Sequence, residues 1–322
     1  IAVAAIVVFC LFPFYWLISL SLKTGADLGD SSLIPPNPTL ANYKSIFQND
    51  DFILSLRNSA IISLTTTALA LLVGSFCAYA LARLRFRGKF LILAIVLTIS
   101  TFPQIAIAAP LFKLWSDIGI FNTWIGLIIP YLTFALPLTV YILVSFFREI
   151  PKDLEEAAYV DGASPLQTFW KVLLPLIAPG LVTTGLLAFI AAWNEYLFAL
   201  SFIQSPNNYT VPIGITSFVG KSGSAFQQPW GEIMAATIIV TLPLIVAVLV
   251  LQKRILAGLT QPEEGRVIVD GEPAHAMRAQ MAFAGHAAAL KDELTVEENL
   301  RALVELAGEP ATREALHDAL VA

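Results

Sequence analysis

A polar segment between two apolar stretches carries carboxylates at the spacing of a helix start. Residues 148–175 read REIPKDLEEAAYVDGASPLQTFWKVLLP, in which Asp153, Glu155 and Glu156 follow a proline and precede Gly162. Carboxylates in a first turn are stabilised by the positive end of the helix dipole, and glycine is a common helix stop. A carboxylate can bind donors on a partner, so the chemistry that this segment offers is noncovalent docking.

A second helix is expected directly after Gly162. Ser164 is a good N-cap, Pro165 suits the first helical position, and Gln167 completes a capping box. Apolar residues then recur at helical spacing as far as Pro175. The segment therefore predicts a helix-turn-helix element on the membrane surface. It could be an amphipathic connector or a lever that docks into a partner, and these patterns leave both open.

Another group of polar residues interrupts an apolar stretch. Asn194 and Glu195 lie between Trp193 and Tyr196 in the sequence AWNEYLFALSF. An ionisable group inside a membrane is costly, so it indicates function by default. Aromatic rings that stack on sugar faces, with Asn and Glu binding hydroxyls, would suit a carbohydrate path. An interfacial aromatic belt with a solvated glutamate is the structural alternative.

The elements that must position these residues are membrane helices. The 322 residues are 57% hydrophobic and only 13% charged, against roughly 25% charged in a soluble domain. Backbone groups in hydrocarbon must be satisfied within a segment, so apolar runs of about 20 residues without barrel alternation predict helices. The chain starts inside the first run, which we take for a shortened span rather than a signal core. The six predicted spans are residues 1–22, 59–82, 90–112, 124–146, 176–199 and 232–252.

Lys and Arg near the span ends predict the orientation. Nine of them flank the ends on the side of residues 148–175, and five are spread over the longer loops of the other side. The first side is therefore expected in the cytoplasm, together with the amino end and the residues after the last span. A net charge of -5 without an extended basic surface excludes nucleic acid as a partner.

The sequence Glu156-Ala157-Ala158, followed by Gly162 and by Leu174-Pro175, resembles the EAA-loop signature of binding-protein-dependent ABC importer permeases. Further similar stretches are NPTLANYKSIF, PLFKLWSDIGIFNTWIGLIIPY, AWNEYLFALSF and QKRILAGL. Over about residues 1–260 the chain resembles the maltose-type permease subunit of carbohydrate importers. Within that group it is most similar to the actinobacterial trehalose or disaccharide importer subunit.

The resemblance implies an all-α, six-span permease and a role for each motif residue. Glu156, Ala157, Ala158, Asp161 and Gly162 would form a coupling helix seated in a cleft of a cytoplasmic ATPase. Alanines allow close approach, and glycine permits a turn with positive φ. The implied partners are that ATPase dimer, which binds ATP and Mg²⁺, a second homologous permease, an external sugar-binding protein and membrane lipid. The chain itself would hold no cofactor, bind no metal and catalyse no reaction.

Two other classes of membrane protein compete with an importer subunit. An ion-coupled secondary transporter predicts inverted repeats and paired carboxylates near the midplane, and the sequence shows neither pattern. A structural membrane subunit without a pathway is the other alternative. Contact between residues 148–175 and an ATPase would separate an importer from both.

Residues 261–322 are expected to form a separate cytoplasmic tail. They hold 5 Lys and Arg against 12 Asp and Glu, whereas residues 1–260 hold 14 against 12. The tail resembles a fragment of a haem-exporter-type ABC ATPase, which implies a small α/β-like piece with His286 at or beside the Q-loop position. It lacks a phosphate loop and an LSGGQ-like signature. A fusion junction, a regulatory appendage and chance similarity all remain open explanations.

Overall fold

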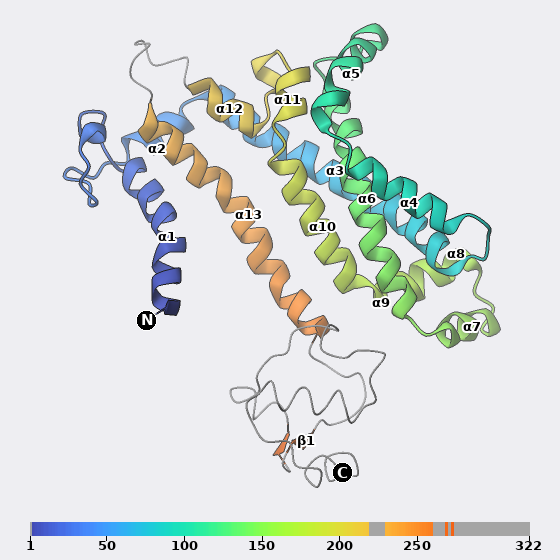
Figure 1. The fold of residues 1–322 in the computed structure, drawn as a ribbon. Helices are drawn as coiled ribbons and strands as arrows, with labels where there is room; N and C mark the ends of the chain where they lie inside the picture. Colours follow the sequence, from blue (N-terminus) through green and yellow to red (C-terminus); the bar gives the residue numbers. More distant parts are fainter. Residues whose placement is uncertain (1, 219–228, 260–267, 270–271, 274–322) are drawn as a thin grey trace. The chain divides into compact units, whose positions relative to one another are not determined.

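The computed structural model describes residues 2–218, 229–259, 268–269 and 272–273. The chain divides into two compact units, Ile1–Thr260 and Gln261–Ala322. All described helices lie in the first unit, as Figure 1 shows. In the second unit, the described residues form a short antiparallel pair, β1 (Ile268–Val269) with β2 (Glu272–Pro273). The predicted ATPase-like features of the tail, including His286, lie outside the described residues.

Two long apolar helices, α3 (Asp50–Arg83) and α6 (Trp124–Glu149), form the centre of the first unit. They pack closely because small residues face each other: a Cβ built on Gly74 would come within 2.5 Å of the Thr139 Cγ2 atom. Small residues at a contact let helix backbones approach in a membrane protein. The start of α6 confirms the predicted boundary at residue 124.

The first turn of α3 explains why this helix begins nine residues before the predicted span. The Asn49 side chain accepts a hydrogen bond of 3.1 Å from the Asp51 backbone N–H, which is an N-cap. Asp50 and Asp51 then lie in the first turn, where the helix dipole favours acidic residues. The sequence prediction from apolar content alone therefore missed the polar beginning of the helix.

The predicted span over residues 90–112 is not one continuous helix. This region forms α4 (Lys89–Ser100) and α5 (Gln104–Ile118), and their axes differ by 89°. Pro103 lies at the break, where it has no N–H for a helical hydrogen bond and disfavours helical geometry in the residue before it. The pair is a bent span or a re-entrant segment.

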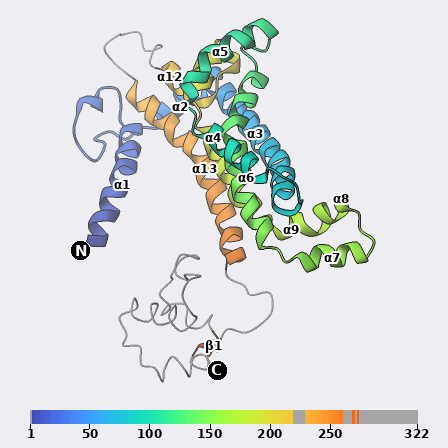
Figure 2. The same ribbon diagram turned by 45° about the vertical axis from the view of Figure 1, so that its right-hand side comes forward.

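Helix α10 contacts α3, α6 and α13, and α1 lies against α13 (Figures 1 and 2). The predicted span 176–199 is shorter than expected, because α10 ends at Trp193 and a new short helix begins at Leu197. The first and last predicted spans, residues 1–22 and 232–252, correspond to α1 and α13. The bounds are α1 Ala2–Ser21, η1 Asp27–Gly29, α2 Ala41–Phe47, α10 Ala178–Trp193, α11 Leu197–Phe202, η3 Pro206–Asn208, α12 Val211–Ser217 and α13 Trp230–Leu259.

The number of membrane crossings depends on how the two bent helix pairs are counted. Among the described residues, three helices are long and apolar enough to cross a membrane, and five crossings result if each of two bent pairs counts as one. The apolar helix Ala5–Ser21 of α1 is shorter than these. The all-helical fold is therefore as predicted, whereas the count of six spans stays a prediction.

Asn122 joins the loops at the end of the bundle where α5 meets α6. Its Oδ1 atom accepts hydrogen bonds from the backbone N–H groups of Gln204 and Ser205, at 3.0 and 3.1 Å. Its backbone φ is 59°, a left-handed conformation that asparagine tolerates better than most residues. Asn58 of α3 reaches the same loop, because its Nδ2 atom donates to the Asn207 carbonyl at 2.8 Å.

Replacing Asn58 by alanine is expected to destabilise this end of the bundle by about 2 kcal/mol, since two carbonyls would lose a buried donor. The amide donates to the backbone oxygens of Asn207 and Tyr209, and Asn58 is fully buried. Thermal unfolding of the purified subunit in detergent would measure the loss. An unchanged midpoint would contradict the proposed support.

Candidate functional site

The polar segment folds as the predicted helix-turn-helix element. The first arm is α7 (Lys152–Val160), and the second consists of α8 (Pro165–Thr168), a π-helical turn η2 (Phe169–Leu173) and α9 (Leu174–Leu176). The predicted capping box is confirmed: the Gln167 N–H donates to the Ser164 hydroxyl, and the Ser164 N–H donates to the Gln167 side chain. Each arm therefore has its own local start signal.

The turn between the arms has two hydrogen bonds of a Schellman C-cap. The Ala163 N–H donates to the Ala158 carbonyl at 2.9 Å, and the Gly162 N–H donates to the Tyr159 carbonyl at 3.0 Å. Gly162 has a φ of +84°, as predicted from its position. A side chain would meet nothing within 4 Å there, so the backbone conformation alone requires glycine.

The second arm contains a π-helical turn that the sequence did not predict. The Leu174 N–H bonds to the Phe169 carbonyl, five residues back, instead of four. Pro175 has no N–H, and a proline ring crowds the carbonyl four residues before it, here that of Lys171. A widened turn relieves this crowding. The arm meets α10 at 78° directly afterwards.

The five predicted coupling residues do not all face the same way. Glu156, Ala157, Asp161 and Gly162 are exposed, whereas Ala158 is only 9% exposed. The arrangement offers a partner an exposed strip on α7 and the turn, while Ala158 packs against the rest of the chain. Ala158 therefore serves the packing of α7 here, and Ala157 is the alanine available for outside contact.

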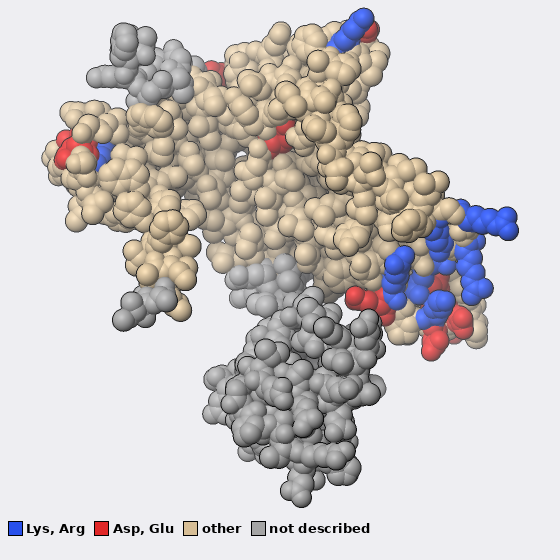
Figure 3. Space-filling model, viewed as in Figure 1, with Lys and Arg blue, Asp and Glu red and all other residues tan. Residues whose placement is uncertain are grey.

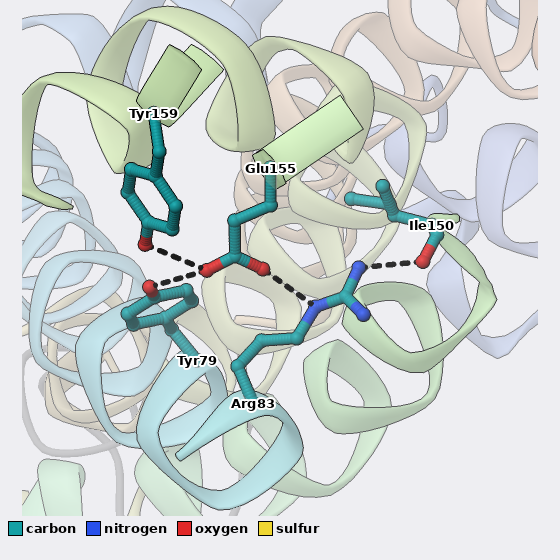
Figure 4. A network of polar contacts seen from close by, with 5 residues as sticks. All are labelled: Tyr79, Arg83, Ile150, Glu155 and Tyr159. Atoms are coloured by element: carbon teal, nitrogen blue, oxygen red, sulfur yellow. Dashed lines mark hydrogen bonds and ion pairs between the residues drawn. The ribbon is translucent and has the colours of Figure 1, made fainter. Parts of the chain in front are cut away.

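Glu155, which the sequence placed only in the helix start, is the centre of a polar network (Figure 4). Its Oε1 atom accepts hydrogen bonds from the hydroxyls of Tyr79, at 2.9 Å, and Tyr159, at 3.1 Å. Its Oε2 atom lies 3.6 Å from the Nε atom of Arg83. Partial burial raises the pKa of Tyr159, so this hydroxyl is a donor at neutral pH. No pattern in the local sequence identifies this network, because Tyr79 and Arg83 come from α3.

An aromatic cluster supports the second arm from the inside. The Phe169 ring stacks on Phe76 with centroids 4.7 Å apart and meets Tyr79 edge-on at 5.3 Å. Phe147 of α6 contacts both Tyr79 and Phe169. Both arms of the element are therefore attached to α3, one through polar contacts and the other through rings.

Positive charge gathers around the helix-turn-helix element. Figure 3 shows Lys and Arg side chains clustered at the end of the molecule that carries α7 and α8, with acidic residues among them. The opposite end shows few charges in this view. The contributing basic residues of the described chain are Arg83, Arg85, Arg87, Lys89, Arg148, Lys152 and Lys171.

The four predicted sugar-path residues separate into two groups. Trp193 is 3% exposed and its Nε1 atom donates to the Val240 carbonyl at 3.3 Å, so it joins α10 to α13. Glu195 is 7% exposed and accepts hydrogen bonds from the N–H groups of Phe198 and Ala199, at 2.7 and 3.1 Å. Asn194 and Tyr196 are exposed, and the Asn194 Nδ2 atom donates to the Ile190 carbonyl at 2.9 Å.

The Glu195 contacts explain the break between α10 and α11. The carboxylate caps the two N–H groups in the first turn of α11 that no helical carbonyl can reach. A negative charge there also meets the positive end of the helix dipole. The sequence signal for this role is a glutamate two residues before an apolar helix.

The described residues form a bundle of apolar helices with an exposed helix-turn-helix element at one end, which is typical of an integral membrane protein. The chain belongs to the family of binding-protein-dependent transport system inner membrane components, which it matches over residues 70–261. The match ends at residue 261, so the resemblance of residues 262–322 to an ATPase gains no support from it.

Proteins with assigned transport roles are similar over nearly their whole length. The trehalose transport system permease protein SugB of Mycobacterium tuberculosis is 50% identical over 255 residues, 79% of this chain and 92% of that protein. The trehalose/maltose transport system permease protein MalG of Thermococcus litoralis is 43% identical over 255 residues, 79% and 91% of the two chains.

Solved structures support the fold. A chain of a bacterial ABC transporter that imports the acidic polysaccharide alginate superposes with a TM-score of 0.66 at 24% identity, over 78% of this chain and 93% of that chain. The alginate transporter in complex with an alginate pentasaccharide-bound periplasmic protein gives a TM-score of 0.59 at 16% identity, over 78% and 91%. This protein thus has the permease fold of ABC importers.

Proposed function

We propose that this chain is the permease subunit of an ATP-driven importer that moves a disaccharide, such as trehalose or maltose, across the cytoplasmic membrane by alternating access. The observation that carries the proposal is 50% identity to a trehalose permease over 92% of that protein. The second relative is named for trehalose and maltose, which favours a disaccharide over other sugars.

The exposed strip of α7 is the proposed docking site for the ATPase. Glu156 and Asp161 supply carboxylates to donors on the ATPase, and Ala157 allows its surface to come close. Gly162 shapes the turn. ATP and Mg²⁺ bind the ATPase dimer, and the permease transmits the closure of that dimer to its spans.

The same proposal includes three further partners. A second homologous permease completes the pathway, and a sugar-binding protein delivers the substrate at the outer face. The alginate transporter that shares this fold was solved with a sugar-bound periplasmic protein, which supports the second partner. Membrane lipid surrounds the exposed apolar residues of helices such as α1.

The charge distribution supports an orientation with α7 and α8 in the cytoplasm. Lys and Arg gather at this end (Figure 3), and basic residues are enriched in cytoplasmic loops. The amino end and residues 261–322 then lie in the cytoplasm as well. The proposed domain boundary at residue 260 coincides with the division between the two compact units.

Asn194 and Tyr196 are the proposed sugar-contacting residues of the predicted four. An exposed ring can stack on a sugar face, and an exposed amide can bind hydroxyls. Trp193 and Glu195 support this segment from inside the chain, through their contacts with α13 and α11. The pathway is thus assigned to the exposed face of the α10–α11 junction.

A cysteine at position 157 is expected to crosslink to a co-expressed ATPase, because the Ala157 side chain is exposed on α7. The experiment starts from a chain whose native Cys10 and Cys77 are replaced. Ser31→Cys, exposed in the loop before α2, is the matched control and should give no crosslink. A crosslink from the control alone, or from neither site, would refute the docking proposal and favour the competing classes of membrane protein.

Uptake assays identify the sugar. A deletion strain complemented with this chain and its partner subunits should accumulate labelled trehalose, and unlabelled maltose should compete if both disaccharides enter. Uptake that persists when the ATPase gene is deleted would contradict ATP-driven import. If collapse of the sodium or proton gradient stops uptake while the ATP level is unchanged, the chain is instead a secondary transporter.

A further inference from the structure

The inward face of α7 carries a charged contact that the docking proposal does not use. The Glu155 side chain is 13% exposed and that of Arg83 is 6% exposed, whereas the neighbouring Glu156 is exposed. Of these two adjacent glutamates, Glu156 is therefore exposed, whereas Glu155 points toward Tyr79 and Arg83 of α3 (Figure 4). A charge removed from water is costly unless it is paired. The Arg83 Nε atom lies 3.6 Å from the Glu155 Oε2 atom, which is an ion pair without a hydrogen bond.

Arg83 connects three elements at this point. Its Nε atom faces Glu155 of α7, and its Nη2 atom donates to the carbonyl of Ile150 at the end of α6. The last carbonyls of a helix have no partner within that helix, so an arginine there also stabilises the end of α6. Arg83 is itself in the last turn of α3.

Tyr79 connects the same helix to both arms of the element. One turn before Arg83, its hydroxyl donates to Glu155 of the first arm, while its ring packs edge-on against Phe169 of the second arm. A rotation of the element about the end of α3 would have to break the polar contact or the ring contact. Tyr79 thus contacts both arms from one span.

We propose that Glu155, Arg83 and Tyr79 form a clamp that fixes the helix-turn-helix element to the cytoplasmic end of α3, so that displacement of α7 by the ATPase is transmitted to this span. Glu155 is a positioning residue in this scheme, because it acts through α3 and touches neither sugar nor nucleotide. The inference rests on the proposed function and adds the route by which movement leaves α7.

Two tyrosines provide a matched test. Tyr79 and Tyr159 both donate to the same Glu155 oxygen, but Tyr79 comes from α3 and Tyr159 from α7 itself, four residues on. Tyr79→Phe removes a contact that crosses between elements and keeps the ring packing. Tyr159→Phe removes an equivalent contact that stays within one helix. Only the first should weaken transmission.

The measurement is the number of ATP molecules hydrolysed per trehalose taken up by the complete complex in proteoliposomes, with binding protein and ATPase. Glu155→Gln should raise this ratio about tenfold, because it leaves the largely buried Arg83 without a charged partner. Tyr79→Phe should raise it by a smaller factor, and Tyr159→Phe should leave it unchanged. The exposed Glu149→Gln on the last turn of α6 is the charge control.

The crosslink from Ala157→Cys to the ATPase is measured in each variant. A retained crosslink with a raised ratio supports the clamp, since docking is intact and transmission is lost. An unchanged ratio in Glu155→Gln, an equal rise in Tyr159→Phe and Tyr79→Phe, or loss of the crosslink in both Glu155→Gln and Tyr79→Phe would each overturn it. Failure of the crosslink in the otherwise unaltered chain would refute the docking proposal instead.

Discussion

Replacing Gly162 by proline is expected to abolish sugar uptake while the subunit still inserts into the membrane. Proline fixes φ near −65°, whereas Gly162 has a φ of +84°. The substitution also removes the N–H that donates to the Tyr159 carbonyl in the C-cap of α7. The angle between the two arms would then change, and the exposed strip of α7 would no longer fit its docking site on the ATPase.

Gly162→Ala is the graded control for this prediction. A Cβ meets no atom within 4 Å at this position, so alanine adds only the strain of a left-handed conformation, about 1–2 kcal/mol. Uptake should therefore fall partly with alanine and completely with proline. Membrane insertion is followed by fractionation and uptake by labelled trehalose. Normal uptake by the proline variant would count against the lever.

Replacing Glu195 by alanine is expected to destabilise the subunit by about 3 kcal/mol, because two hydrogen bonds to a charged acceptor are lost. The carboxylate is 7% exposed and caps the N–H groups of Phe198 and Ala199. The unfolding midpoint in detergent should drop clearly. The concentration of sugar that gives half-maximal uptake should stay the same for the protein that folds, since the side chain faces α11 rather than a solute.

The Glu195→Gln variant distinguishes between two roles of this side chain, helix capping and sugar binding. The amide keeps one oxygen that can accept from Phe198 or Ala199 but loses the negative charge, so about half of the lost stability should return. An intact midpoint with a raised half-saturation concentration in both variants would show that the residue binds sugar. Tyr196→Ala, at an exposed position, should have the opposite profile, with weaker uptake and an unchanged midpoint.

Local signals accounted for most of the helix-turn-helix element. The capping box of Ser164 and Gln167 is formed within four residues, and the turn at Gly162 is formed within six. Such contacts depend on neighbours along the chain, which a sequence displays directly. The boundary of α6 at Trp124 was predictable for a similar reason, because Thr123 caps the helix through the Gly126 N–H.

Predictions based on hydrophobic content were less accurate where backbone geometry intervened. Residues 90–112 contain no charged residue, yet Pro103 divides them into two helices at 89°. Residues 176–199 are largely apolar, but α10 ends at Trp193 and Glu195 caps the first turn of α11. Hydropathy indicates that a segment prefers lipid or a protein interior, and it does not say whether the helix is continuous.

The sequence by itself determined the class of the protein: an apolar helical membrane chain with one polar helix-turn-helix element whose caps are local. Only the tertiary structure decided which of two adjacent glutamates faces outward. Glu156 is exposed, while Glu155 meets Tyr79 and Arg83 of a helix more than 70 positions earlier in the chain. The physical reason is that a side chain's role depends on which distant groups its helix packs against, and packing joins residues whose spacing in sequence carries no periodic signal.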